Sequence, residues 1–312
     1  MRAVATLAAA GLLTLGPPGS LSRPEDAIRA GMDGRPHEVT TSGAVALGNT
    51  AAFLPDPEKP LPHKPKRVVR QLVKVSSHLS ASVRRWVTKG HPSWARRPPR
   101  AVVLQALYQQ RIYRMLTKRK NRVLARTVLD RLDGRLAWFA RATIRAGAGL
   151  RAQITPLRPP ITMRTGRPAP AGDLLRYYKR AQRRFGVAWE LLAAVNFVET
   201  KFGRVKSRSP AGARGPMQFL PATWRAYGLG GNIFSPRDAI LGAANYLHAS
   251  GAPGDNRKAL FAYNSSTAYV DAVLKYAHRM MRNRLDYFAY YNWQVFVITT
   301  KGDIRLTGPQ HD

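Results

Sequence analysis

Apolar residues recur at the spacing of amphipathic helices over most of the chain beyond residue 100. This periodicity predicts helices over residues 102–116, 123–132 and 136–144. Residues 187–198 carry a further helical pattern, and another helix is predicted from about Thr267. Because most of the strongly patterned sequence is helical, the predicted fold class is mainly α.

Near the C-terminus the helical spacing gives way to the alternation that is typical of a strand. Residues 293–306 predict a short β-hairpin whose turn covers residues 299–303. Because an isolated hairpin is only marginally stable in water, we expect it to pack on the helices, within an appendage over residues 287–312. Three aromatic residues here are interpreted as a structural cap rather than the rim of a binding surface: Tyr290, Tyr291 and Trp293.

The N-terminus predicts export. One arginine precedes an apolar run over residues 3–15, which is too short for a membrane span and suits the apolar part of a signal peptide. A signal peptide is therefore expected over residues 1–22, with a mis-assigned start codon as the alternative, and the protein is placed in the cell envelope or outside the cell. Residues 23–59 are rich in Gly, Pro and Ala without periodicity, which predicts a disordered linker.

The most informative candidate for chemistry is Glu199, near the end of the apolar helical pattern. Glu190 lies nine residues earlier. At roughly 100° per residue the two carboxylates face opposite sides of a helix and cannot act as a pair. The negative end of the helix dipole and shielding by Phe197 and Phe202 would both raise the pKa of Glu199, as a general acid requires. From the helix alone, a solvated glutamate at a helix end is the more common explanation.

Three ordered motifs change that balance. They are Glu199-Thr200, the run from Ser209 to Gln218 (SPAGARGPMQ), and Ala262-Tyr263-Asn264. Together they resemble the signature of the lytic transglycosylases, whose catalytic domain is related to goose-type lysozyme. The resemblance covers about 173–284, and three motifs in the right order are far more specific than any one of them. Glu199 is therefore interpreted as catalytic.

The resemblance implies a lysozyme-like all-α catalytic domain over residues 171–286 and a role for each motif residue. Glu199 would act as general acid and later as base. Ser209 would hydrogen-bond near the acid or the acyl group of a sugar, and Gln218 would line the cleft. Tyr263 would also line it, with a hydroxyl that could reach the acid, and Asn264 would bind sugar or brace the loop. Thr200, Pro216 and Ser265-Ser266 depart from the family pattern without removing the acid.

The implied reaction cleaves the β-1,4 bond between N-acetylmuramic acid and N-acetylglucosamine in peptidoglycan glycan strands. Ordinary glycosidases use two carboxylates, but each Asp near the candidate domain has a structural explanation. In the family, the C6 hydroxyl of the muramic acid residue replaces the second carboxylate, which gives a 1,6-anhydro end. Hydrolysis by water, as in lysozyme, remains the alternative. The residues considered as a second carboxylate are Asp173, Asp238, Asp255 and Asp271.

Composition excludes several other chemistries. The chain of 312 residues has no cysteine, which rules out disulfides, thiol catalysis and cysteine-ligated metals. Its seven His residues never fall at metal-ligand spacing, and no glycine-rich phosphate loop occurs. We therefore expect neither a metal nor a cofactor.

The charge is strongly positive, +34 at pH 7. Residues 60–170 carry 26 Lys and Arg against only Asp130 and Asp133, and predict a basic helical region that packs as hairpins against or beside the catalytic domain. Such a surface attracts polyanions. For an exported protein these are anionic wall polymers or an anionic membrane surface, and nucleic acid is not favoured. A non-catalytic basic protein that binds the cell wall or nucleic acid is the alternative function.

Overall fold

The computed structural model describes residues 53–88 and 97–309. The predicted signal peptide and most of the predicted linker lie outside these residues. Residues 53–59, however, make defined contacts that do not fit a disordered linker. The Phe53 ring packs on His78 and Tyr108, and the Arg111 guanidinium donates to the Lys59 carbonyl at 2.9 Å.

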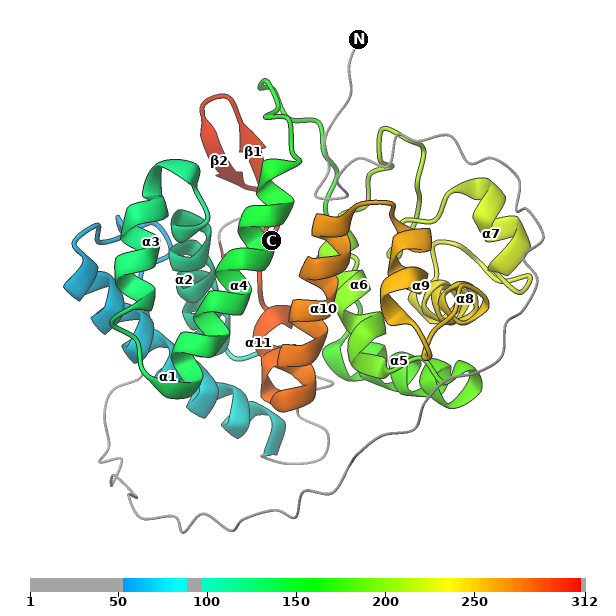
Figure 1. Ribbon diagram of the computed structural model, residues 1–312, viewed down its shortest axis with the longest axis horizontal. Helices are drawn as coiled ribbons and strands as arrows, with labels where there is room; N and C mark the ends of the chain where they lie inside the picture. The colour runs from blue at the N-terminus through cyan, green and yellow to red at the C-terminus, as the bar shows by residue number, and fades with distance from the viewer. Residues whose placement is uncertain (1–52, 89–96, 310–312) are drawn as a thin grey trace, which may run out of the picture. The chain divides into compact units, whose positions relative to one another are not determined.

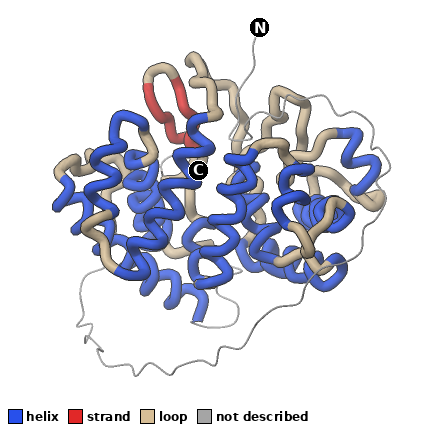
Figure 2. The backbone as a smooth tube through the Cα atoms, viewed as in Figure 1, coloured by secondary structure: helices blue, strands red, loops and turns tan. Residues whose placement is uncertain are grey.

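The described residues form eleven α-helices, one short 3-10 helix and a single two-stranded sheet (Figures 1 and 2), which confirms the mainly α-helical prediction. The helices are α1 (Pro65–Thr88), α2 (Arg100–Leu116), α3 (Arg122–Leu129), α4 (Gly134–Ala152), α5 (Ala171–Phe185), α6 (Trp189–Thr200), α7 (Pro221–Tyr227), α8 (Pro236–Ala249), α9 (Asn256–Tyr263), α10 (Thr267–Arg282) and α11 (Leu285–Tyr291), with the 3-10 helix η2 at Arg119–Asn121. The predicted helices over 102–116, 123–132 and 136–144 correspond to α2, α3 and α4.

Helix α6 lies at the centre of the fold because its sequence is apolar on every side. Of its twelve residues, all but Glu190 are buried. A helix that is apolar all round can only be stable inside a protein. It packs against α5, α8, α10 and α11. Any polar residue on α6, including Glu199, is therefore carried into the interior.

Helix α10 connects the basic N-terminal helices to the rest of the fold. It packs extensively against α4 and against α6, so that Figure 1 shows it between them. Its buried residues recur at helical spacing, as an amphipathic helix requires. They are Tyr269, Val270, Ala272, Val273, Tyr276, Ala277, Arg279 and Met280. The residues of α10 thus touch both the region of basic helices and the segment that carries Glu199.

The predicted β-hairpin is confirmed, with a tighter turn than expected. Strands β1 (Phe296–Thr299) and β2 (Gly302–Arg305) pair antiparallel, and Thr299 is opposite Gly302. The hairpin therefore turns at Thr300 and Lys301, and three residues assigned to the turn lie in the strands. The Thr299 hydroxyl donates to the Gly302 carbonyl at 2.7 Å, which stabilises the narrow connection.

The aromatic residues before the hairpin belong to the core. Tyr290, Tyr291 and Trp293 are each no more than 5% exposed, in keeping with a structural cap rather than a binding rim. Helix α11 runs through residue 286, where the sequence suggests the end of the catalytic domain. Among the described helices, none combines the length and the apolar character needed to cross a bilayer.

A buried ion pair fixes α11 to α10. The Arg279 Nη2 atom lies 3.1 Å from Asp286 Oδ2, and both side chains are nearly inaccessible. The same guanidinium donates to Thr143 on α4 and lies over the Phe139 and Tyr290 rings, 4.5 and 5.1 Å from their centroids. One cation thereby ties together three helices.

We predict that Asp286→Ala lowers the free energy of unfolding by about 3 kcal/mol, because it leaves the buried Arg279 charge without its counter-ion. The matched control is Asp271→Ala, whose pair with Arg257 is solvent-exposed and should be worth less than about 1 kcal/mol. Urea denaturation of both variants measures the difference. Equal losses in the two variants would contradict the assignment of Arg279 and Asp286 as a structural anchor.

Candidate active site

The end of helix α6 is held in an uncommon backbone conformation. Lys201, Phe202 and Gly203 follow one another with φ values of 52°, 62° and 84°, all in the left-handed region. Glycine adopts this region freely, whereas a side chain there costs free energy that the surroundings must supply. The chain therefore turns sharply just after Glu199, and the turn fixes the direction in which α6 ends.

Thr200 links this turn to the loop that follows. Its hydroxyl donates to the Pro216 carbonyl at 2.6 Å and accepts from the Gly203 amide at 2.8 Å. Thr200 is fully buried, so both bonds form away from water. The threonine that departs from the family pattern thus keeps a hydroxyl that joins the end of α6 to the loop carrying Gln218.

Glu199 is buried, with only 3% of its surface exposed. The Tyr269 hydroxyl on α10 donates to its Oε1 atom at 2.7 Å. Burial raises the pKa of Glu199 to about 7, while the Tyr269 hydrogen bond and the charge of Lys201 act in the lowering direction. At neutral pH the carboxyl group therefore exists in both protonation states, which suits a group that must donate and then accept a proton.

Lys201 is the cation that acts on this acid. Its Nζ atom donates to the Phe197 carbonyl at 2.7 Å and lies 4.2 Å from the centre of the Phe197 ring. Burial lowers the pKa of Lys201 to about 7, with Arg114 acting in the same direction and Glu199 opposing it. The expected shielding aromatics, Phe197 and Phe202, are both buried and contact each other.

The loop from Ser209 to Phe219 is held by its own backbone. Arg214 and Phe219 exchange two backbone hydrogen bonds, of 2.8 and 2.9 Å, and close a tight turn. Gly215 stands within it with φ of 72°, and a Cβ there would lie 2.0 Å from the Ile233 carbonyl oxygen. Since no side chain fits that space, Gly215 allows the loop to approach the segment before α8.

Gln218 and Ser209 both lie in this loop. Gln218 is 8% exposed and donates from Nε2 to the Gly215 carbonyl at 3.0 Å, whereas its buried Oε1 has no hydrogen-bond partner among the described residues. A buried acceptor without a partner is uncommon in proteins, which makes Gln218 a candidate for a functional role. Ser209 Oγ accepts from the Ala213 amide at 3.0 Å, so Ser209 braces the loop.

The sequence suggested that the Tyr263 hydroxyl could reach Glu199, but in the structure it bonds elsewhere. Its hydroxyl donates to the Met217 carbonyl at 2.6 Å and so holds the residue next to Gln218. Burial raises the pKa of Tyr263, and the charge of the nearby Glu199 acts in the same direction. Asn264 ends helix α9, and its backbone carbonyl accepts from the Ser266 amide at 2.7 Å, which favours the bracing role.

The tyrosine that hydrogen-bonds to Glu199 is Tyr269, which the sequence did not predict as a site residue. A signal was available, because Tyr269 belongs to the buried stripe of α10 together with Val273 and Tyr276. A tyrosine on a buried face needs a hydrogen-bond partner for its hydroxyl. Its partner, Glu199, lies on a different helix 70 residues earlier, and sequence periodicity carries no information about that pairing.

The four aspartates considered as second carboxylates are engaged elsewhere. Asp255 caps α9 and accepts from the Lys258 amide at 2.9 Å. The Asp238 carboxylate accepts from Asn232 and Arg237 near the start of α8. Asp173 pairs with Arg176, and Asp271 pairs with Arg257 and Lys275. These contacts give each aspartate a structural role. The charged group that affects the pKa of Glu199 is instead the cation Lys201.

Comparison with known proteins agrees with this geometry. Residues 176–285 match the family described as Transglycosylase SLT domain. This segment is similar to transglycosylase SLT domains over about a third of the chain. It carries Glu199, Gln218, Tyr263 and Tyr269, and the resemblance to lytic transglycosylases is confirmed.

A curated relative points the same way. The chain is 36% identical over 81 residues to the membrane-bound lytic murein transglycosylase F of Thiobacillus denitrificans. The match covers 26% of this chain and only 17% of that relative. No solved structure matches the chain significantly.

The raised pKa of Glu199 predicts how stability depends on pH. The pKa is near 4.5 in the unfolded chain and about 7 in the folded one. The contribution of the neutral carboxyl is therefore fully present below pH 4.5 and is lost as pH rises through about 7. We expect the wild type to lose about 3 kcal/mol over this range relative to Glu199→Gln, which cannot ionise.

Urea denaturation of both proteins at several pH values measures this difference. Glu199→Gln is a suitable reference because the amide keeps the size of the side chain and its ability to accept from Tyr269. A difference between the two proteins that stays constant across the range would show that Glu199 titrates at its ordinary pKa.

Proposed function

We propose that this protein is a peptidoglycan lytic transglycosylase that cleaves the β-1,4 bond between N-acetylmuramic acid and N-acetylglucosamine. The observation that carries the proposal is the state of Glu199. It is a buried carboxyl group with a pKa near 7, hydrogen-bonded by Tyr269, within a transglycosylase SLT domain. A carboxyl group in this environment holds a proton at neutral pH and can transfer it.

In the proposed reaction Glu199 acts twice. The protonated carboxyl first donates to the glycosidic oxygen, and the bond between that oxygen and the anomeric carbon of muramic acid breaks. The carboxylate then takes the proton from the C6 hydroxyl of the same residue, whose oxygen bonds to the anomeric carbon. The product is a 1,6-anhydro end, and the acid returns to its starting state. A single acid suffices because the substrate supplies the nucleophile.

The neighbouring residues have separate roles in this proposal. Tyr269 positions the carboxyl group and stabilises its ionised form through the hydrogen bond to Oε1. Gln218 would line the cleft, and a rotation of its side chain would bring the buried, unpartnered Oε1 to a sugar amide or hydroxyl. Ser209 and Asn264 shape the loops beside the substrate, and Tyr263 fixes the Met217 backbone next to Gln218.

We place this activity in the cell envelope. The relative from Thiobacillus denitrificans is described as membrane-bound, and the substrate of a murein transglycosylase lies in the wall. Residues 60–170 would add attraction to anionic wall polymers or to an anionic membrane surface, since the chain carries a net charge of +34. Partners of this kind would hold the enzyme near its substrate.

We predict that Glu199→Gln abolishes release of glycan fragments from purified sacculi, by at least about a hundredfold, because the amide cannot donate the proton. The matched control is Glu190→Gln on the same helix, which should retain activity. The readout is mass analysis of the fragments after borohydride reduction, where anhydro ends stay unreduced.

The outcomes of this assay separate the alternatives. Reducible ends would assign the protein to the lysozyme-type hydrolases. Binding of sacculi without cleavage by the wild type would identify a non-catalytic wall-binding protein. Undiminished cleavage by Glu199→Gln would show that another residue is the acid.

We also predict that Tyr269→Phe moves the alkaline limit of activity upward by up to about one pH unit. The hydrogen bond from Tyr269 lowers the pKa of Glu199, so its removal keeps the acid protonated to higher pH. The control is Tyr276→Phe, a buried tyrosine of the same helix that packs on Phe197. If the two variants show the same pH profile, Tyr269 does not set the proton affinity of the acid.

A further inference from the structure

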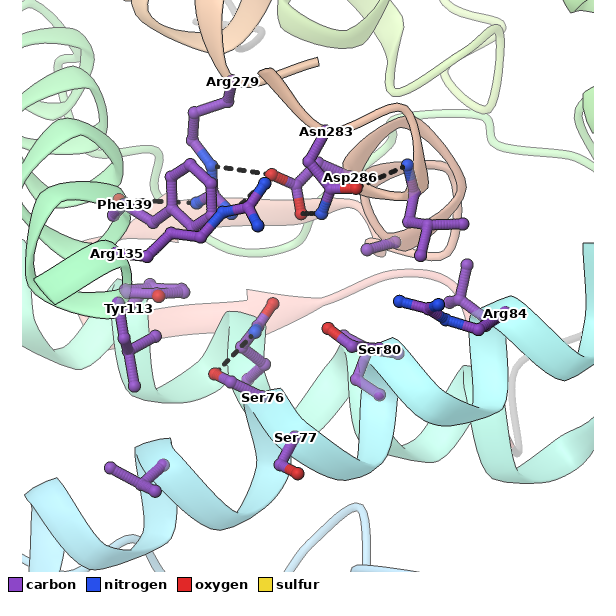
Figure 3. A pocket seen from close by; sticks show the side chains of 17 residues that line it. Ser76, Ser77, Ser80, Arg84, Tyr113, Arg135, Phe139, Arg279, Asn283 and Asp286 are labelled. Atoms are coloured by element: carbon purple, nitrogen blue, oxygen red, sulfur yellow. Dashed lines mark hydrogen bonds and ion pairs between the residues drawn. The ribbon is translucent and has the colours of Figure 1, made fainter. Parts of the chain in front are cut away.

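A second site lies away from Glu199, on the side of α10 that faces the basic helices. A cavity of about 350 Å³, open to solvent on one side, is lined by residues of α1, α2, α4, α10 and α11 (Figure 3). Its volume falls within the range of small-molecule binding sites. None of the residues that line it belongs to α6 or to the loop of Gln218, so the cavity is separate from the candidate active site.

Helix α1 contributes small hydroxyl side chains to this cavity. Its apolar stripe, which includes Leu72, Val75 and Leu79, is buried against the neighbouring helices. The adjacent stripe presents Ser76, Ser77 and Ser80 to the cavity instead. Because serine is small, the helices leave a hollow here, and because each hydroxyl can donate and accept, the hollow is lined with hydrogen-bonding groups. Ser76 Oγ already accepts from Gln109 Nε2 at 3.1 Å.

Two arginines face each other across the cavity. Arg84 comes from α1 and Arg135 from α4, and Figure 3 shows them on opposite sides. Neither forms an ion pair with a carboxylate of the described residues. The one acid of the lining, Asp286, is already paired with Arg279. The lining therefore carries an excess of positive charge.

The remaining wall is apolar. Phe139 of α4 lies across the cavity from the serines in Figure 3, and Leu136, Leu285 and Ala289 add apolar lining from α4 and α11. The Arg135 guanidinium is 5.3 Å from the centre of the Phe139 ring, which holds it at the edge of this surface. The Arg135 guanidinium also donates to the Arg282 carbonyl at 3.3 Å. Hydroxyl groups, an apolar face and two exposed cations that form no ion pair thus line one volume.

We propose that this cavity binds a single ring of an acidic sugar, one that carries a carboxylate or a phosphate. The acidic group lies against Arg84 and Arg135, since guanidinium groups recognise both kinds of anion. The ring hydroxyls bond to the serines and to Asn283, and the C–H face of the ring packs on Phe139. A fatty acid would leave the serine hydroxyls without partners, and a neutral sugar would leave the two cations unneutralised. This site is independent of cleavage at Glu199.

Isothermal titration calorimetry of the full chain tests the proposal with four probes. N-acetylmuramic acid and glucose 6-phosphate supply the two kinds of acidic group, and N-acetylglucosamine and glucose are their neutral counterparts. We expect at least one acidic probe to bind with one-site stoichiometry and at least about tenfold more tightly than its neutral counterpart. The acidic probe that binds shows whether the site recognises a carboxylate or a phosphate. If neither acidic probe exceeds its counterpart, the proposal is wrong.

A pair of double variants locates the binding. Arg84→Gln with Arg135→Gln removes both cations of the cavity and should weaken the acidic probe at least about tenfold. The control is Arg122→Gln with Arg126→Gln, which removes the same charge from the exposed face of α3, outside the cavity. An equal loss in the two double variants would mean that the probe responds to net charge alone and would overturn the proposal.

Ser80→Phe provides a test that leaves the charge unchanged. Ser80 is exposed on α1, so the larger ring should fill the hollow without unfolding the protein, and circular dichroism verifies the fold. Binding of the acidic probe should be lost. Retained affinity in a folded Ser80→Phe variant would contradict the site. Cleavage of sacculi should continue in each of these cavity variants, so failure of this inference is distinguishable from failure of the proposed activity.

Discussion

The structure depends on the burial of one carboxyl group between two helices. Helix α6 is apolar on every side, and it carries Glu199 inward, where desolvation raises its pKa. A buried acid without a partner would be costly, and Tyr269 of α10 supplies that partner. The packing of α6 against α10 therefore sets both the position and the proton affinity of the acid.

The basic helices belong to the same framework. Helix α10 packs against α4 as well as α6, and Arg279 is tied to Thr143 of α4 and Asp286 of α11. A displacement of α4 would thus also displace α10, the helix that carries Tyr269. A region whose composition predicts polyanion binding therefore also supports the helix that holds Tyr269, and two of its arginines, Arg114 and Arg151, form largely buried ion pairs with Asp303.

Local patterns reveal part of this arrangement. The motifs around Glu199, Ser209 and Gln218 lie close in sequence, and the alternation of apolar and polar residues predicts the hairpin. Tyr269 could not be assigned in this way, because its partner lies 70 residues away and only the packing of two helices joins them. The partner of Tyr263 was mistaken for the same reason, and the serine stripe of α1 becomes a cavity wall only through its neighbours.

The left-handed turn after α6 has a consequence for engineering. Lys201 sits there with φ of 52°, where glycine or asparagine would relieve the backbone. The same residue supplies a charge that restrains the pKa of the neighbouring acid. Exchanging it for glycine would make the turn easier to form and the acid harder to ionise. At this one position, lower backbone strain and a lower pKa of Glu199 therefore cannot both be obtained.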